Sequence, residues 1–339
     1  MLKEERYFHF IRERIGMPFS VEVECHASSL VHLGGEKFMA VWFCGSKESR
    51  PDTAIYAAWR DENGWSVPEM LVKVGYVAHW NPVLFKKSDG SLLLFFKVGE
   101  TIATWKTYVM EGDAEGRHWS LPHELVPGDE TGGRGPVKNK PIRLADGRIL
   151  APMSRERGAW KAFADLSSDD GRTWRCSEEV PVPKLSLDDK FGGNCLGVIQ
   201  PTAWESEPGQ VHMLMRSNNG RIYRTDSTDG GETWSEIVAT ELPNNNSGID
   251  LAKLEDGSLL LVYNPVEGNW GNRWKIAMTI SKDNGDSWCE PIMLDQVDCD
   301  QRGGRKSEFS YPAVIPCDGG AAIIYTSHRN SFTFWRLKR

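Results

Sequence analysis

Six times along the chain, two apolar stretches typical of β-strands flank a short turn that contains glycine. Pro82–Phe85 before one such turn and Leu92–Phe96 after it are an example. Asp-Gly between two β-type runs is a strong hairpin signal, because glycine readily adopts the positive φ angles of tight turns. The six turns are Gly34-Gly35, Asp89-Gly90, Asp146-Gly147, Pro208-Gly209, Asp256-Gly257 and Asp318-Gly319. They predict six antiparallel sheets.

A second repeat, Ser-x-Asp-x-Gly-x-Ser/Thr-Trp, lies between these hairpins. Three complete copies end at Trp174, Trp234 and Trp288, and two degenerate copies end at Trp65 and Trp119. Successive tryptophans are therefore 54 to 60 residues apart, a spacing typical of one four-stranded propeller blade. The Asp side chains are expected to brace the turns, and the tryptophans are expected to be buried between neighbouring blades.

Five blades obtain four strands from one hairpin of each kind, but the sixth, which begins at Ser307, has only about three. A stretch near Val21–Glu24 or slightly earlier is expected to supply its outer strand, because joining both termini in one blade removes exposed sheet edges. The sequence thus predicts an all-β, six-bladed β-propeller that forms a single domain over residues 1–339. The blades are expected at about 24–70, 78–125, 138–182, 197–240, 246–296 and 306–339 plus the N-terminal strand.

Charge and composition limit the classes of binding partner that the sequence allows. The net charge of −7 provides no basic surface for nucleic acid or for an anionic membrane. The first residues are charged and lack the apolar stretch of a secretory signal, so a cytoplasmic protein is expected. Seven cysteines without a Cys-x-x-Cys pair indicate reduced thiols and neither a disulfide framework nor a zinc site. No cofactor or metal is predicted, and a calcium ion near Asp188-Asp189 is left open.

The first strand of each propeller blade lines the central channel, and its start faces any ligand bound there. Counting nine residues back from the hairpin glycine reaches one residue in each blade: His26, Asn81, Lys138, Gln200, Gly248, and Ser310 beside Tyr311. Polar groups buried in a channel must be paired or used. We therefore expect the polar members of this ring to surround a binding site.

Charged side chains follow the second strands at the same end of the channel. An exposed rim is the simpler interpretation for most of them. Arg216 is the exception, because it directly follows the apolar strand Val211–Met215 and its guanidinium is expected to point into the funnel, where it can grip a carboxylate. The charged set comprises Lys47, Glu48, Arg50, Asp52, Lys97, Glu100, Arg155, Glu156, Arg157, Arg216, Glu267, His328 and Arg329.

With these turns and this channel, the chain resembles the sialidase (neuraminidase) superfamily, specifically its BNR or Asp-box proteins, over roughly residues 24–338. The resemblance implies the six-bladed propeller and the removal of a terminal acidic sugar. In that reaction a Tyr attacks, a carboxylate activates it, an Asp is the acid/base and three Arg hold the substrate carboxylate. Tyr311, in Glu308-Phe-Ser-Tyr311-Pro, matches the nucleophile, Asp52 matches the acid/base, and Arg216 matches the second arginine.

Three positions depart from the pattern of that superfamily. His26 stands in place of the first arginine, Gln200 in place of the activating Glu, and Thr279 in place of the third arginine. A neutral Gln cannot assist deprotonation of a Tyr as a carboxylate does. Glu308 is an alternative carboxylate if the start of its strand is bulged. Ordinary sialosides are therefore expected to be poor substrates.

The leading hypothesis is an exo-acting glycoside hydrolase, related to sialidases, that cleaves a terminal acidic or deoxy sugar with an incomplete arginine triad. One alternative is a lyase on a uronate-containing glycan, in which Arg216 with Lys138 neutralises the carboxylate and Tyr311 with His26 or His79 moves protons. Another is a propeller that binds sugar without cleaving it. The expected partner is a small carbohydrate or oligosaccharide. The candidate catalytic residues are Asp52, Tyr311, Glu308 and His26, and the candidate substrate-binding residues are Arg216, Gln200, Asn81, Lys138, Lys97 and His79.

Overall fold

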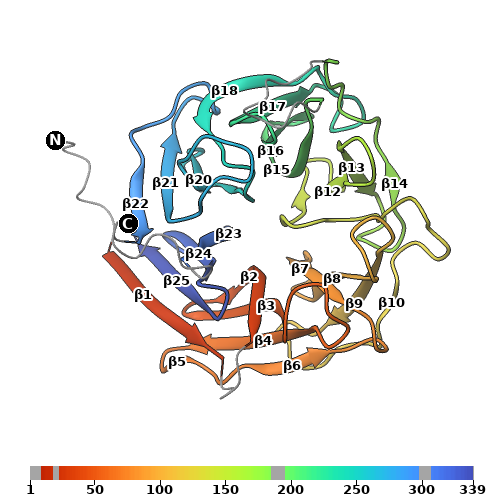
Figure 1. Cartoon of the computed structure of the whole chain (residues 1–339), viewed down its shortest axis with the longest axis vertical. Helices are drawn as coiled ribbons and strands as arrows, with labels where there is room; N and C mark the ends of the chain where they lie inside the picture. The colour runs from red at the N-terminus through yellow and green to blue at the C-terminus, as the bar shows by residue number, and fades with distance from the viewer. Residues whose placement is uncertain (1–8, 18–22, 185–194, 298–306, 339) are drawn as a thin grey trace.

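The computed structural model describes residues 9–17, 23–184, 195–297 and 307–338. Six antiparallel sheets surround a central axis as the blades of a propeller (Figure 1). The prediction of an all-β, six-bladed propeller is thus confirmed. Within the described ranges, no helix has the length and apolar character needed to cross a membrane.

The first three blades follow one another in chain order. The first contains β2 (Glu24–Gly34), β3 (Lys37–Gly45), β4 (Ala54–Asp61), β5 (Gly64–Trp65) and β6 (Glu69–Val72). The second contains β7 (His79–Lys86), β8 (Leu92–Val98), β9 (Lys106–Gly112) and β10 (His123–Glu124). The third contains β11 (Ile142–Arg143), β12 (Ile149–Arg155), β13 (Lys161–Ser167) and β14 (Arg175–Cys176). The first blade has a fifth strand because β5 and β6 both pair with β4.

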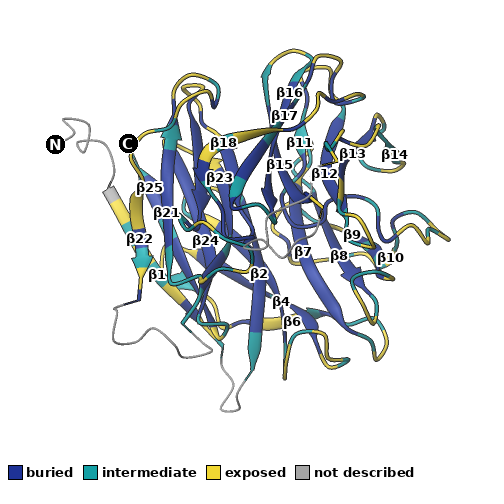
Figure 2. Ribbon diagram, turned by 45° about the horizontal axis from the view of Figure 1, so that its top comes forward, coloured by how far each residue is buried: buried dark blue, intermediate teal, exposed yellow. Residues whose placement is uncertain are grey.

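The remaining blades repeat this plan. The fourth contains β15 (Val198–Glu207), β16 (Gln210–Ser217), β17 (Arg221–Ser227) and β18 (Val238–Pro243). The fifth contains β19 (Asp250–Lys253), β20 (Leu259–Tyr263), β21 (Lys275–Ser281) and β22 (Ile292–Gln296). The sixth contains β23 (Phe309–Cys317), β24 (Gly320–Ser327), β25 (Ser331–Lys338) and, from the other end of the chain, β1 (His9–Gly16). Inner strands are buried, whereas loops and outer strands carry most of the exposed residues (Figure 2).

The ring closes through the N-terminal strand. β1 pairs antiparallel with β25, from His9 opposite Lys338 to Gly16 opposite Ser331. The outer strand of the last blade therefore lies earlier than the Val21–Glu24 stretch named from the sequence, and Glu24 instead begins the inner strand of the first blade. Pairing the first strand with the last covers the outer edge of β25 and joins the two ends of the chain in one blade.

The inner strands of four blades share a bulge near their start, where the pairing register shifts. In each bulge one residue has a positive φ angle: Ala27 (56°), Asn81 (37°), Gln200 (52°) and Tyr311 (53°). Positive φ is uncommon for residues other than glycine. A bulge bends the strand and changes the direction of a side chain. These four bulges therefore set which side chains enter the mouth of the channel.

The tryptophan turns pack each blade against the preceding one. In the turn that ends at Trp174, Asp169 accepts hydrogen bonds from Ser167 Oγ (2.9 Å) and Thr173 Oγ1 (2.6 Å). Burial raises the pKa of Asp169, but these hydrogen bonds lower it more, to about 2. The Trp174 ring lies edge-on to Phe95 of the second blade, with 5.8 Å between ring centroids. Burial of the tryptophans between blades is confirmed for Trp234, whereas Trp174 and Trp288 are only partly buried.

One prediction about the cysteines is wrong. Cys25 on β2 and Cys44 on β3 are directly opposed and are joined as a disulfide. The two cysteines are 19 positions apart in the sequence and meet because the hairpin pairs them across its two strands. A short motif such as Cys-x-x-Cys does not reveal a pair of this kind. Among the described residues the free thiols are Cys176, Cys195, Cys289 and Cys317.

Replacing Trp234 by Ala should lower the free energy of unfolding by about 3–5 kcal/mol. The ring is 7% exposed, and its Nε1 donates to Ser177 Oγ of the third blade at 3.1 Å. Chemical denaturation followed by circular dichroism measures the change. Trp270→Ala, which removes a tryptophan that is 66% exposed, is the matched control and should leave the midpoint unchanged. An equally stable Trp234→Ala variant would contradict the role of this turn in joining the blades.

Candidate active site

Tyr311 is the centre of a cluster at the mouth of the channel. Arg216 Nη1 donates to Tyr311 Oη at 2.9 Å and to Gln200 Oε1 at 3.0 Å. Gln200 Nε2 lies 3.4 Å from the same Tyr311 oxygen. Arg216 is 2% exposed, and its Nε donates to Asn246 Oδ1 at 2.9 Å. The guanidinium is therefore held rigidly toward the phenol, as expected from its place after the apolar run Val211–Met215, near the end of β16.

One of the predicted ring positions, Ser310, needs a correction of one residue. The bulge residue of the first blade is Ala27, although His26 is the side chain that reaches Tyr311, and the bulge residue of the sixth blade is Tyr311 and not Ser310. Gly248 leaves open the place where three side chains converge. A Cβ atom there would lie 3.1 Å from Lys138 Cε, 3.4 Å from Tyr311 Cδ2 and 3.5 Å from Gln200 Oε1.

His26 packs against Tyr311. Their ring centroids are 4.1 Å apart, and His26 Nδ1 is 2.9 Å from Thr326 Oγ1. His26 Nε2 is buried and has no hydrogen-bond partner among the described residues. Burial, with a smaller effect of the positive charge of Arg329, holds the pKa of His26 well below its ordinary value. The imidazole is therefore neutral near pH 7 and retains one nitrogen beside the phenol that is not otherwise engaged.

Glu308 lies beside this cluster but is held between two arginines. Arg273 Nη1 donates to Glu308 Oε1 and Arg329 Nε donates to Glu308 Oε2, both at 2.9 Å. Burial alone would raise the pKa of Glu308, but the attraction of Arg273 and Arg329 lowers it well below the ordinary range. A carboxylate stabilised in this way is a poor proton acceptor, so the structure does not support Glu308 as the activating base.

Arg273 is a site residue that the sequence did not reveal. Its guanidinium lies 5.5 Å from the centroid of the Tyr311 ring. The pattern of the sialidase superfamily places the third arginine at the position of Thr279. Arg273 lies six positions earlier, in the loop between β20 and β21. In each blade, the second strand is followed by a loop at the mouth of the channel. Arg273 lies in such a loop, and this position is the signal that could have identified it. The expectation that only one arginine reaches this site is therefore wrong.

Glu156 was assigned to the exposed rim, but it faces the cluster from the loop after β12. Its Oε1 lies 3.4 Å from Gln200 Nε2, the nitrogen that also approaches Tyr311. Burial raises the pKa of Glu156 above its ordinary value, although Arg216 opposes the shift. It is therefore a carboxyl group close to Tyr311 for which no ion pair is found within the described part of the chain.

Trp270 presents an aromatic surface at the mouth. It is 66% exposed, and its ring centroid lies 5.6 Å from the Arg216 guanidinium. Its loop is tied to a buried Asn-rich turn, because Gly268 N donates to Asn244 O and Gly271 N donates to Asn245 O, both at 3.1 Å. An exposed ring on a fixed loop is suited to stacking on the apolar face of a sugar.

Lys138 forms part of the channel floor and is not a free substrate-binding group. Its Nζ donates to Asn139 Oδ1 (2.8 Å) and to the backbone oxygens of Ile249 (3.0 Å) and Pro312. Three acceptors match the three N–H donors of an ammonium group. Burial lowers the pKa of Lys138 to about 7. The predicted role in binding substrate is therefore corrected to one in closing the channel beneath Tyr311.

Three further predicted binding residues are occupied by the backbone. His79 Nδ1 is 2.9 Å from the Val77 oxygen and its Nε2 accepts from Val74 N at 2.8 Å. Lys97 is fully buried and donates to Thr107 Oγ1 (2.7 Å) and to the Arg134 oxygen (2.9 Å). Asn81 donates to the Val137 oxygen at 3.0 Å and so links the second blade to the third. The predicted roles of His79 and Lys97 in substrate binding are therefore corrected to structural roles. Asn81 uses its side-chain Nδ2 group in the link to the third blade.

Asp52 lies in the loop between β3 and β4, near the mouth but turned toward its own loop. It accepts hydrogen bonds from Ser46 N (2.9 Å) and Ser46 Oγ (3.1 Å). Slight burial raises its pKa, but these bonds lower it more, so the net pKa is below the ordinary value. No hydrogen bond among the described residues joins it to Tyr311, Arg216 or His26. The role of Asp52 as the acid/base therefore stays a prediction.

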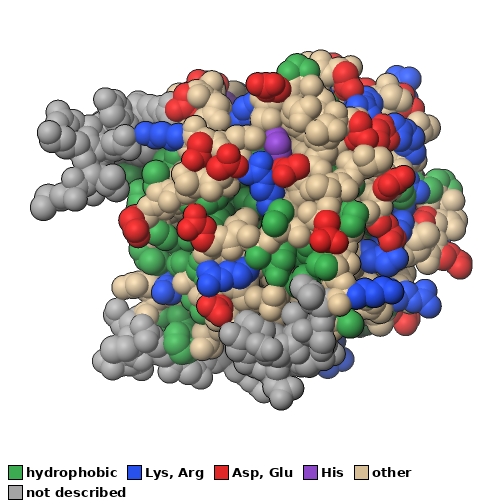
Figure 3. Space-filling view, turned by 90° about the horizontal axis from the view of Figure 1, so that it is seen from above, with side chains coloured by type: hydrophobic (Ala, Val, Ile, Leu, Met, Phe, Trp, Pro, Cys, Tyr) green, Lys and Arg blue, Asp and Glu red, His purple; other side chains and the backbone are tan. Residues whose placement is uncertain are grey.

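No group of three or more His, Cys, Asp or Glu side chains within the described ranges could hold a metal ion. Asp188-Asp189 lies outside those ranges. On the face shown in Figure 3, acidic and basic side chains are interspersed and do not gather in one basic patch.

Comparison with known proteins places this geometry in context. Residues 36–324 match the family of BNR repeat-like domains. An anhydrosialidase of Macrobdella decora is 25% identical over 208 residues, which make up 57% of this chain and only 25% of that relative. A Hadza microbial sialidase superposes with a TM-score of 0.73 at 17% identity, covering 93% of this chain and 66% of the other.

A protein of unknown function from Dyadobacter fermentans superposes equally well. Its TM-score is 0.73 at 15% identity, with 97% of this chain and 99% of the other covered. The family match spans most of the chain, and the solved sialidase has the same propeller fold. The chain therefore belongs to the family of BNR repeat-like domains and is a sialidase-like propeller.

Proposed function

We propose that this protein is an exo-acting carbohydrate-active enzyme that cleaves a terminal acidic sugar, with Tyr311 as the reacting side chain. The observation that supports it most directly is the contact of Tyr311 Oη with Arg216 Nη1 at 2.9 Å, with a second guanidinium, that of Arg273, beside the same ring. The Arg216 guanidinium fixes the direction of the phenol oxygen, and a side chain that attacks a bound sugar must be held in a defined orientation. The relationship to sialidases supports the same chemistry, because their nucleophile is a Tyr.

Arg216 and Arg273 provide the contacts for an acidic group. The hydrogen bonds found among the described residues use Arg216 Nε and Nη1 and Arg273 Nη1. Each guanidinium thus retains an Nη2 group that these bonds do not use. A carboxylate accepts such pairs of N–H donors in good geometry. Trp270 then lies beside Arg216, where it can stack on the sugar ring.

Glu156 is the carboxyl group best suited to donate a proton to the leaving oxygen. In this mechanism the phenol proton of Tyr311 passes to the neutral His26 as Tyr311 attacks the anomeric carbon, the glycosidic C–O bond breaks, and the leaving oxygen takes the proton of Glu156. A water molecule then gives one proton to Glu156 and its hydroxide to the anomeric carbon as the bond to Tyr311 breaks, and Tyr311 recovers its proton from His26. A proton donor needs a pKa near the working pH, which burial favours at Glu156. Gln200, whose amide lies between Glu156 and Tyr311, positions both groups.

A second candidate is a uronate lyase, and the neutral His26 favours it. Its buried and unpartnered Nε2 next to Tyr311 provides the paired His and Tyr that a proton abstraction requires. Incubation with a panel of terminally acidic oligosaccharides, including sialosides because Arg273 restores one arginine, separates the candidates by mass. Products whose combined mass exceeds that of the substrate by one water indicate a hydrolase. An unsaturated uronate that absorbs ultraviolet light indicates a lyase. Binding without turnover of any panel member would contradict both enzymes.

Arg216→Ala should reduce kcat/KM on the acidic substrate by a factor equivalent to about 2–5 kcal/mol, the cost of leaving a buried charge without its partner. Arg216→Lys should be less damaging because it keeps the charge, although it loses the paired donors. Arg221→Ala is the matched control, since Arg221 is 42% exposed and donates to the Glu241 oxygen. Equal activity in all three variants would exclude Arg216 from substrate binding. Thermal melting of each variant separates a folding defect from lost binding.

Glu156→Gln should lower kcat by about 100-fold or more on a natural glycoside, the range of a lost general acid. Glu156 must be protonated to act, so wild-type activity should fall as pH rises through its raised pKa. The variant should lack that basic limb in its pH–rate profile. An aryl glycoside with a good leaving group needs no protonation and should lose far less activity. Glu179→Gln, at a 41% exposed side chain, is the control, and an unchanged basic limb in Glu156→Gln would assign the proton donor elsewhere.

A further inference from the structure

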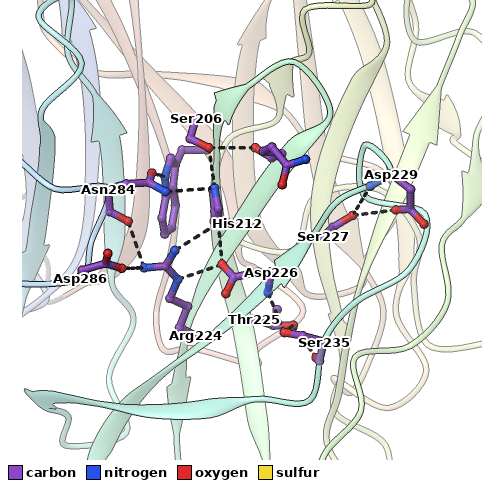
Figure 4. A network of polar contacts seen from close by, with 12 residues as sticks. Ser206, His212, Arg224, Thr225, Asp226, Ser227, Asp229, Ser235, Asn284 and Asp286 are labelled. Atoms are coloured by element: carbon purple, nitrogen blue, oxygen red, sulfur yellow. Dashed lines mark hydrogen bonds and ion pairs between the residues drawn. The ribbon is translucent and has the colours of Figure 1, made fainter.

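A second cluster of reactive side chains lies in the fourth blade, away from Tyr311 (Figure 4). Ser206 Oγ is 2.7 Å from His212 Nε2, and His212 Nδ1 is 2.5 Å from Asp226 Oδ1. Ser206 is near the end of β15, whereas Gln200 of the Tyr311 site is near its start, so the two clusters lie at opposite ends of this strand. The clusters share no residue.

The hydrogen bonds define the roles of the two His212 nitrogens. Arg224 Nε donates to Asp226 Oδ1 at 2.8 Å. Burial raises the pKa of Asp226, but the bonds from His212 and Arg224 lower it more, so the carboxylate is ionised near pH 7. An ionised carboxylate accepts a hydrogen bond from the Nδ1–H group, which leaves Nε2 as the acceptor for the Ser206 hydroxyl. Arg224 Nη2 approaches Nδ1 only at the longer distance of 3.3 Å. Serine, base and orienting carboxylate thus stand in the order that activates a serine.

The imidazole is fixed from both sides, as a general base in such a triad must be. The Trp204 ring stacks on it with 4.9 Å between centroids and an interplanar angle of 26°. Trp204 Nε1 also donates to Asn284 Oδ1 at 2.7 Å, which orients the amide of Asn284. Asn284 Nδ2 then lies 3.3 Å from His212 Nε2, next to the serine hydroxyl. An amide N–H fixed beside the nucleophile is suited to stabilise an oxyanion.

The serine is also accessible. Ser206 is partly exposed, whereas His212 is 7% exposed. Ser206 lies at the bulge between Glu205 and Glu207, where the register with β16 shifts. Lys253 Nζ donates to the carbonyl oxygens of Glu205 (2.8 Å) and Ser206 (2.9 Å). The neighbouring residues Trp204, Glu205 and Lys253 line a cavity of about 680 Å³, although Ser206 itself is not among the residues that line it.

We propose that Ser206, His212 and Asp226 form a second catalytic site that hydrolyses short-chain acyl esters. Ser206 Oγ attacks the acyl carbon while His212 Nε2 takes its proton. The same proton passes to the leaving alcohol oxygen as the ester C–O bond breaks, which leaves the acyl group on Ser206. A water molecule then gives one proton to His212 and its hydroxide to the acyl carbon. The products are a carboxylic acid and an alcohol, and Ser206 recovers its proton.

A fluorophosphonate probe tests this site directly, because it reacts with serines that a neighbouring base activates. The folded wild-type protein should become labelled on Ser206, in the tryptic peptide that ends at Arg216, and should release nitrophenol from p-nitrophenyl acetate. Ser206→Ala should abolish the label at this peptide. His212→Ala and Asp226→Asn should slow labelling by about 100-fold or more, the scale of a lost general base. Melting temperatures show whether each variant is folded.

Ser91→Ala is the matched control. Ser91 Oγ donates to Asp89 Oδ1 at 2.6 Å in another blade and has no His in that contact, so its removal should leave labelling and ester hydrolysis unchanged. Absence of label on Ser206 in the folded wild-type protein would overturn the proposal and reduce the cluster to a brace between blades. The same conclusion would follow if Asp226→Asn, folded and stable, were labelled at the wild-type rate.

Discussion

The structure depends on one buried carboxylate at the axis of the propeller. Asp250, on the fifth blade, is 1% exposed and accepts hydrogen bonds from Lys140 Nζ at 3.0 Å, Thr202 Oγ1 at 2.8 Å and Val314 N at 2.8 Å. These partners come from the third, fourth and sixth blades, so one anion joins four of the six sheets. A buried carboxylate without partners would cost several kcal/mol. The neighbouring Lys138 repeats the arrangement with opposite charge, because its ammonium is satisfied by acceptors from the third, fifth and sixth blades.

This polar floor determines what the mouth of the channel can do. Below Tyr311, hydrogen bonds from neighbouring blades satisfy the charges of Lys138 and Asp250. The side chains above them are therefore not required to close the axis. The bulges at Gln200 and Tyr311 turn those two side chains toward Arg216, and Gly248 leaves room between them. The cost of positive φ at non-glycine residues is of order 1–3 kcal/mol each. Strain of this kind persists where the rest of the fold imposes it, and here the paired inner strands do so.

The sequence was most informative where the physics is local. Glycine turns and tryptophans at a period of 54 to 60 residues predicted the blades, since hairpin chemistry acts over a few residues. Counting along inner strands reached Asn81 and Gln200, which are bulge residues of their strands, but it reached Ser310 in place of its neighbour Tyr311. The pairing of Glu308 with Arg273 and Arg329 was not detectable, because it joins loops of two blades. His79 and Lys97 were misassigned for a related reason: their partners are mostly backbone atoms, which no residue pattern reveals.

The arrangement of charge around Tyr311 follows from the same need for compensation. Arg216, Arg273 and Arg329 bring three positive charges close together, which would repel one another at short range if nothing intervened. Glu308 accepts hydrogen bonds from two of these arginines, and Glu48 binds the outer side of Arg329. Among the described residues no carboxylate forms an ion pair with Arg216, which is held by the neutral groups Gln200, Asn246 and Tyr311. The positive charge that remains uncompensated is therefore concentrated at Arg216, next to the phenol. In the proposed function, the anionic group of the substrate would bind at that point and complete the charge balance there.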